Sequence, residues 1–98
     1  MTYAKLLKED YVYVLYEQIK TTWVLYRRKP FRVVQYENDS RTITFIIFSE
    51  TKSGTIVTRH VSLSKADAVF FRSWLAQDFP SLEIEIIEGE AHGEENNG

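Results

Sequence analysis

The clearest alternation of apolar and polar positions runs from Ser64 to Phe79, where apolar residues recur at helical spacing. The Ser64 side chain can accept a hydrogen bond from the backbone N–H three residues on, where Asp67 supplies an acidic first turn. Pro80 cannot continue a helix and disfavours helical geometry at Phe79. The pattern therefore predicts one long helix over about 64–79.

This predicted helix has two apolar faces. One side carries Ala66, Val69, Phe70 and Trp74, and the opposite side carries Ala68, Phe71, Leu75 and Phe79. A helix that lies on a sheet needs only one apolar stripe, so the second stripe must be covered by the N-terminal segment of the chain or by a partner.

The N-terminal segment 2–20 has two interpretations. As a helix it presents an apolar stripe at i, i+4 spacing that would cover the second helix face, formed by Tyr3, Leu7, Tyr11, Val14, Leu15 and Ile19. As a strand, the run YVYVLY is rich in β-forming residues. We predict a helical turn over 3–9 followed by a strand over about 11–17. A single helix throughout would weaken the case for an uncovered face.

From Thr22 onward the pattern predicts strands. Pro30 separates two of them and indicates an edge position, because proline donates no ladder hydrogen bond. The strand after the Asn38–Ser40 turn has apolar residues on both faces, which predicts a central strand buried on both sides. Gly54 can take the positive φ of the next turn. The predicted strands cover 23–29, 31–37, 41–50, 55–63 and, after the helix, 82–88. The fold class is thus α+β, a mostly antiparallel sheet of five to six strands with one long helix on one face.

Composition changes this picture only at the ends. Residues 88–98 contain four acidic residues and no Lys or Arg, so we expect a disordered acidic tail after a single domain over 1–87. Cysteine is absent, which excludes disulfides and thiolate metal sites. The first residues lack the apolar core of a signal peptide, and no run is long enough for a membrane span. We expect a cytoplasmic protein that does not bind a membrane.

Motifs that carry catalysis are missing. His60 has no second histidine at metal-ligand spacing, and the sequence contains no HExxH, GxSxG or phosphate-binding glycine loop. Glu83 and Glu85 share one strand face, where an acidic edge that resists aggregation is the simpler interpretation. We therefore expect no enzyme activity, no cofactor and no metal.

Two hypotheses for function follow. The first is a non-enzymatic protein-binding module, a regulator, an inhibitor or the subunit of a homo-oligomer, which buries an aromatic helix face against its partner. Its candidate anchors are Phe71, Leu75 and Phe79, or alternatively Phe70 and Trp74. The second is a nucleic-acid-binding module that uses a basic and aromatic hairpin over 23–32. Its candidate residues are Trp23, Tyr26, Arg27, Arg28, Lys29 and Arg32.

Overall fold

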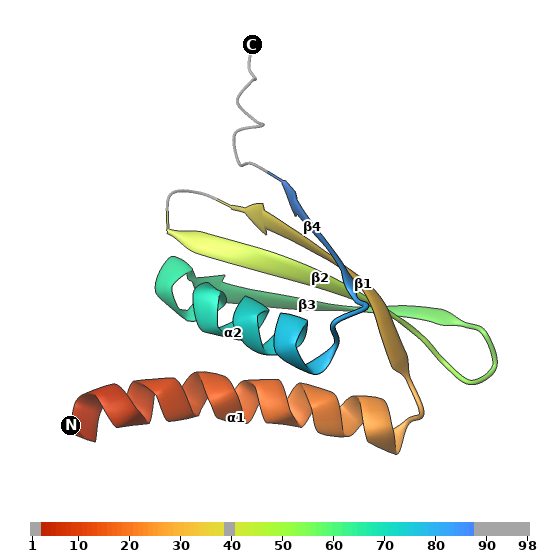
Figure 1. The fold of residues 1–98 in the computed structure, drawn as a ribbon, viewed down its shortest axis with the longest axis horizontal. Helices are drawn as coiled ribbons and strands as arrows, with labels where there is room; N and C mark the ends of the chain where they lie inside the picture. Colours follow the sequence, from red (N-terminus) through yellow and green to blue (C-terminus); the bar gives the residue numbers. More distant parts are fainter. Residues whose placement is uncertain (1–2, 39–40, 88–98) are drawn as a thin grey trace, which may run out of the picture.

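A computed structural model describes residues 3–38 and 41–87, with side chains from Tyr11 onward. The order of elements is α1, β1, β2, β3, α2 and β4 (Figure 1). Their bounds are α1 Tyr3–Leu25, β1 Lys29–Glu37, β2 Thr42–Glu50, β3 Ile56–Ser64, α2 Lys65–Asp78 and β4 Glu83–Ile87. The acidic tail predicted over 88–98 lies outside the described residues.

The described strands form one four-stranded sheet in the order β3-β2-β1-β4. Both hairpin pairings are antiparallel, whereas β4 runs parallel to β1 and reaches that edge through α2. The α+β class is confirmed. The prediction of five to six mostly antiparallel strands with one helix was wrong in detail, because the sheet is mixed and the chain has a second helix, α1. The predicted strand over 11–17 lies in α1, and that over 23–29 is divided between α1, a turn and the first residue of β1.

Helix α1 replaces the predicted strand over 11–17 and the first part of the predicted strand over 23–29, whose residues 26–28 lie in the turn before β1. Its buried side chains recur at helical spacing and pack on the rest of the chain: Val12, Tyr16, Ile19 and Trp23. The predicted helical stripe was only partly correct, since Ile19 is buried while Tyr11 and Val14 are exposed. Burial of this face outweighs the local β preference of the run YVYVLY.

The end of α1 is a Schellman motif built without glycine. Arg27 has φ of 53°, in the left-handed region. Its N–H donates to the Val24 carbonyl at 3.2 Å, and the Arg28 N–H donates to the Trp23 carbonyl at 2.7 Å. These bonds satisfy the last carbonyls and turn the chain into β1.

The edge position predicted from Pro30 does not hold for the strand as a whole, although Pro30 itself precedes the pairing of β1 with β4, which begins at Arg32. β1 pairs with β2 on one side and with β4 on the other. The pairing register of β1 with β2 shifts between Pro30 and Arg32. Proline is tolerated there because it is the second residue of the strand, beside an irregularity that interrupts the ladder.

Helix α2 follows its prediction closely. The Ser64 side chain accepts a hydrogen bond from the Asp67 N–H at 3.2 Å, and Asp67 occupies the first turn. Phe79 caps the other end and donates its N–H to the Leu75 carbonyl. Pro80 follows immediately, as expected for a helix stop.

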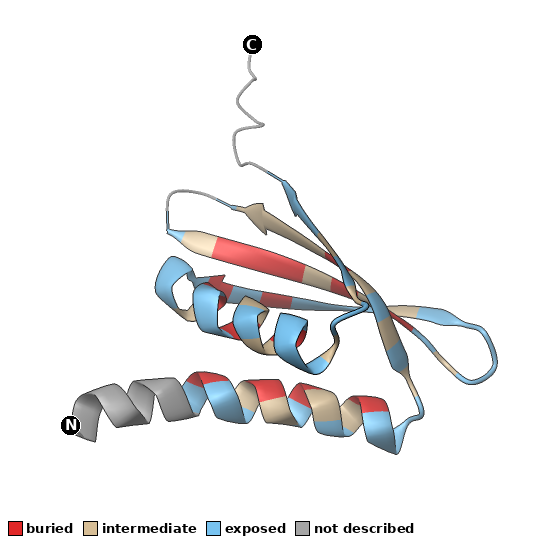
Figure 2. Cartoon of the chain, viewed as in Figure 1, coloured by how far each residue is buried: buried red, intermediate tan, exposed pale blue. Residues whose placement is uncertain are grey.

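Both helices pack on the same face of the sheet, side by side, with α2 crossing β2 and β3 (Figure 1). Burial is concentrated along β2 and on the inward faces of the helices (Figure 2). The Phe71 ring lies between the sheet and α1, with its centroid 4.9 Å from that of Phe45 and 5.4 Å from that of Tyr16. Phe71 belongs to the apolar face of α2 that packs on the sheet and on α1. The second apolar face is mostly uncovered, because Ala66, Val69 and Phe70 are exposed and only Trp74 is half-buried against α1.

No described element covers the other face of the sheet. Ile46 and Phe48 of β2 point to this side and are only half-buried. The expectation that β2 is buried on both faces was therefore wrong. The sheet is one layer covered by helices on one side only.

Candidate functional site

A polar network joins α1 to the C-terminal end of α2. The Tyr16 hydroxyl lies 2.8 Å from Oδ2 of Asp78 and 3.0 Å from the Trp74 carbonyl oxygen, both of which are acceptors. Lys20 Nζ donates to the same carboxylate at 2.9 Å and to Glu17 at 3.4 Å. These contacts fix the separation and register of the two helices.

The network shifts the protonation of its members. Hydrogen bonds from Lys20 and then from Tyr16 hold the pKa of Asp78 below its usual value. The hydrogen bond to Asp78 raises the pKa of Lys20. Burial, and then the bond to Asp78, raises the pKa of Tyr16 well above its ordinary range. Tyr16 is therefore a neutral structural donor at physiological pH and a poor candidate for proton transfer.

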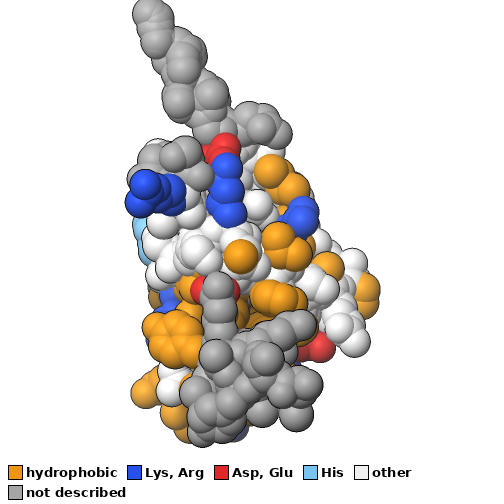
Figure 3. Space-filling view, turned by 90° about the vertical axis from the view of Figure 1, so that its left-hand side faces the viewer, with side chains coloured by type: hydrophobic (Ala, Val, Ile, Leu, Met, Phe, Trp, Pro, Cys, Tyr) orange, Lys and Arg blue, Asp and Glu red, His pale blue; other side chains and the backbone are white. Residues whose placement is uncertain are grey.

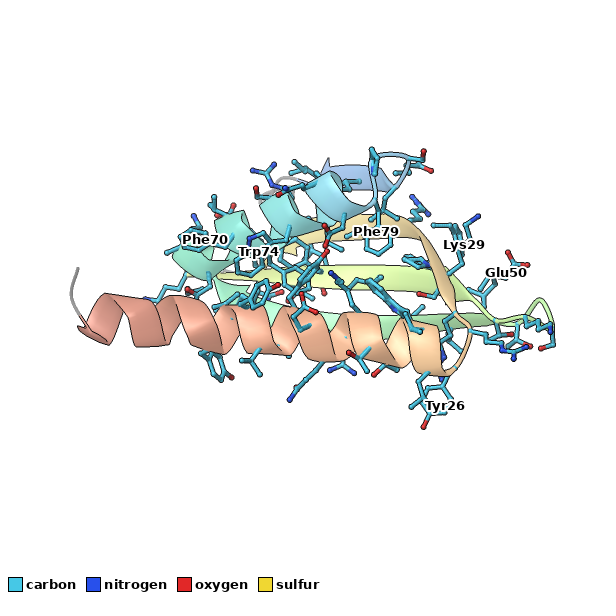
Figure 4. The ribbon with its side chains drawn as sticks, turned by 60° about the horizontal axis from the view of Figure 1, so that its bottom comes forward. Tyr26, Lys29, Glu50, Phe70, Trp74 and Phe79 are labelled. Carbon is cyan, nitrogen blue, oxygen red and sulfur yellow. The ribbon has the colours of Figure 1, made fainter. Side chains whose placement is uncertain are left out.

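Three aromatic rings lie beside this network at the surface between the helices: Tyr13, Phe70 and Trp74, here called the aromatic seam. Trp74 meets Tyr13 edge-on at 5.2 Å between centroids and stacks on Phe70 at 6.0 Å. Tyr13 is 47% exposed and Phe70 39% exposed, while Trp74 is half-buried. In Figure 4, Phe70 and Trp74 lie on α2 beside α1.

The aromatic seam lies toward the end of the molecule at which α1 and α2 begin. Figure 3 views that end and shows hydrophobic side chains at its surface, interspersed with side chains of other kinds. Partly exposed stacked rings of this kind can bury large apolar area at little conformational cost, which suits a protein interface. The seam has no charged member.

The structure places the other predicted anchors in the interior. Phe71 and Leu75 are fully buried beneath α1 and against the sheet. Phe79 is half-buried, with its ring 5.4 Å from that of Trp23. These three side chains therefore stabilise the core. Of the predicted partner-binding residues, only Phe70 and Trp74 reach the surface in the seam.

The basic residues predicted to bind nucleic acid are divided by the fold. Arg27, Arg28 and Lys29 lie in and after the turn that ends α1, and the Arg28 guanidinium lies 5.1 Å from the centroid of the Tyr26 ring. Trp23 is buried in the core and presents no stacking surface. Figure 4 shows Tyr26 at the end of α1 and Lys29 near Glu50, its pairing partner across β1 and β2.

Arg32 lies apart from that basic group, on the uncovered face of the sheet. It forms an ion pair with Glu85 of β4, and its guanidinium lies 5.7 Å from the Phe48 ring centroid. Its partners are thus a neighbouring strand and an aromatic ring. The exposed His60 belongs to the same face, where it pairs in register with Ile46.

A shallow groove separates α2 from β1 and β4. Val69 and Arg72 of α2 form one wall, and Ile86 of β4 forms the other. Gln35 of β1 lines this groove, and its buried side-chain oxygen has no hydrogen-bond partner in the described part of the chain. The groove exists because α2 lies over β2 and β3 and leaves the inner side of β4 partly uncovered.

Sequence reasoning missed two residues of interest. Tyr13 was placed in a strand, although its spacing of three from Tyr16 puts both on adjoining parts of one helix surface. Arg59 was taken as part of an ordinary strand, although it interrupts the apolar row Val57, Val61 and Leu63. That interruption was visible in the sequence.

Within residues 3–38 and 41–87, no group of three or more metal-ligating side chains comes together. Over the same residues, neither helix combines the length and the hydropathy needed to cross a bilayer. Comparisons of the chain with models of protein families, with curated proteins and with solved structures gave no match.

Proposed function

We propose that this chain is a non-enzymatic, cytoplasmic protein-binding module that associates with a second copy of itself through the aromatic seam. The observation that supports this proposal is the group of three adjoining, partly exposed rings of Tyr13, Phe70 and Trp74. Aromatic anchors contribute most of the binding energy at protein interfaces, and two-fold dimers are the commonest oligomers.

The surface around the seam is large enough for a dimer interface. Helix α1 has 23 residues and α2 has 14, so at about 1.5 Å per residue they are roughly 35 Å and 21 Å long. Side by side, helices about 10 Å wide give a projected area on the order of 500 Å². The accessible area of such a ridged surface exceeds its projection and approaches the roughly 800 Å² per partner of a standard interface.

The polar network supports the same proposal. It lies beside the seam and holds α1 against α2, so the three rings are held in place before a partner arrives. A rigid apolar surface loses little side-chain entropy on binding. Interaction with Glu17 raises the pKa of the Tyr13 hydroxyl above its ordinary value.

The test is the mass of the full chain in solution, measured by light scattering on a size-exclusion column across a range of concentrations. We expect a dimer that Phe70→Glu dissociates. Val69→Glu tests how far the interface extends along α2, because Val69 precedes Phe70 on the same helix and is 57% exposed. Ile56→Glu tests the uncovered face of the sheet in the same way.

A monomer at all concentrations would overturn the proposal. A dimer that Val69→Glu or Ile56→Glu dissociates, and that Phe70→Glu leaves intact, would also overturn it by placing the interface elsewhere. Circular dichroism of each variant checks that the fold is retained. The substituted positions are all exposed, so we expect each variant to fold.

Nucleic-acid binding is a second candidate, favoured by the grouping of Arg27, Arg28 and Lys29 beside the exposed Tyr26. It predicts binding to single strands that weakens with salt, with a log–log slope on the order of −2 for about three neutralised phosphates. No binding at low salt would exclude it.

A further inference from the structure

A small polar cavity lies where the C-terminal part of α1 crosses the ends of β2 and β3. Its volume is about 100 Å³, and its walls include Arg28, Arg59, Ser49, Thr22 and Trp23. The volume exceeds the roughly 30 Å³ that one water molecule occupies in the liquid. None of the described residues that line the cavity is acidic.

The side chains of β2 and β3 that face the helices change from apolar to polar at this cavity. On β2 the buried apolar row ends at Ile47, and the next residue on the same side is the buried Ser49. On β3, Arg59 follows the buried Val61 on the side that faces the helices. Arg59 is exposed, so its guanidinium group keeps contact with solvent while it lines the cavity. It interrupts an otherwise apolar row, and such departures from local sequence rules occur mostly at functional sites.

The positive charges of Arg28 and Arg59 are not neutralised by a carboxylate of the described chain. Nε of Arg28 is buried and has no hydrogen-bond partner there. The Arg28 guanidinium lies against the Tyr26 ring, and the backbone N–H of Arg28 donates to the Trp23 carbonyl. Two like charges and a buried free donor around one cavity favour an anion.

We propose that this cavity is an oxyanion-binding site that takes a phosphate group, with Arg28 and Arg59 as its cations and Ser49 as a hydroxyl ligand. Guanidinium groups match phosphate geometry and form strong charge-assisted hydrogen bonds. Two cations balance the charge of a phosphate monoester near neutral pH. The site lies outside the aromatic seam, so it does not depend on the protein-binding proposal.

The experiment is a titration of the full chain with inorganic phosphate, followed by amide chemical shifts at constant ionic strength, with sodium chloride as the reference. We expect saturable shifts that are largest around Thr22, Arg28, Ser49 and Arg59. Arg59→Gln should weaken phosphate binding at least about tenfold, because one charge-assisted hydrogen-bonding group is lost. Arg28→Gln should do the same.

Arg27→Gln is the matched control, because it removes one positive charge next to Arg28 and Arg27 does not line the cavity. We expect its phosphate affinity to stay within about twofold of the original chain, apart from weak long-range electrostatics. Shifts that do not saturate, or an equal loss of affinity in Arg27→Gln and Arg59→Gln, would overturn the site. Retained binding in both cavity variants would also overturn it.

Two further ligands identify the source of the phosphate group. A nucleoside 5′-monophosphate that binds more tightly than inorganic phosphate, and that depends on Arg59, indicates a small metabolite. A single-stranded oligonucleotide that binds more tightly and depends on Arg59, but not on Arg27, indicates a nucleic-acid backbone seated in the cavity. Oligonucleotide binding that depends equally on Arg27 and Arg59 reflects surface charge and counts against the cavity.

Discussion

At the scale of single residues, Arg27 ends α1 in a backbone conformation that costs arginine about 1 kcal/mol or more. Glycine adopts the left-handed region without that penalty. We expect Arg27→Gly to raise the free energy of unfolding by about 0.5–1 kcal/mol, measured by urea denaturation. Lys29→Gly, at the first residue of β1, is the control and should lower it. Destabilisation by Arg27→Gly would contradict the role given to this turn.

Tyr16 joins the core to the polar network with a single hydroxyl group. Its ring is buried against Phe71, and its hydroxyl contacts Asp78 and the Trp74 carbonyl. Tyr16→Phe keeps the ring and should lower the free energy of unfolding by about 1–2 kcal/mol, because a hydrogen bond to a charged group is lost. Tyr11→Phe on the exposed side of α1 should change it little. Equal unfolding midpoints for the two variants would show that the hydroxyl contributes no stability.

At the scale of elements, the contact between α1 and α2 depends on pH. The lowered pKa of Asp78 stabilises the fold above about pH 4, and this contribution is lost as pH falls through the folded pKa. The raised pKa values of Lys20 and Tyr16 stabilise it below about pH 10, and that contribution is lost as pH rises further. We expect greatest stability between these limits.

The measurement for this prediction is the unfolding midpoint in urea across the pH range. The partial exposure of Lys20 and Asp78 keeps the effect modest. Asp78→Asn removes the carboxylate, so the urea unfolding midpoint of this variant should fall less at acid pH than that of the original chain. If the midpoint of Asp78→Asn falls at acid pH as much as that of the original chain, other carboxylates cause the loss of stability.

Strand β4 is the least protected element of the described sheet. It has five residues, pairs only with β1, and is mostly exposed. We expect its amides to exchange with deuterium faster than those of β2, which is paired on both sides and largely buried. Exchange of β4 at the same rate as β2 would mean that β4 opens only with global unfolding.

The elements differ in how far the sequence predicts them. β2 and α2 follow local signals, namely the alternation around Phe45 and the cap at Ser64. Helix α1 does not, because its residues prefer strands and its helical state depends on contacts far along the chain, such as that of Tyr16 with Trp74. Its end also lacks the usual glycine, since Arg27 takes that place.

The candidate sites were likewise predictable from the sequence only in part. Phe70 and Trp74 could be predicted because helical spacing alone puts them on one face of α2. Their neighbour Tyr13 could not, since it comes from another element. The same holds for the pair of Arg28 and Arg59, which only the packing of α1 across β3 brings to one cavity.

At the scale of the whole molecule, the two proposed sites lie in different parts of the fold. The aromatic seam lies between the helices toward the start of α2, and the cavity lies under the C-terminal end of α1. No residue is shared between them. Residues this far apart, with no shared partner, usually act additively.

We therefore expect the two sites to act independently. Phe70→Glu should leave the phosphate affinity within about twofold of that of the original chain. Arg59→Gln should likewise leave the dimer dissociation constant within about twofold. Titrating each variant with phosphate and measuring its mass in the same buffers tests both statements. Loss of phosphate binding on dissociation would mean instead that the second copy completes the cavity, and the coupling free energy would then follow from the ratio of the two affinities.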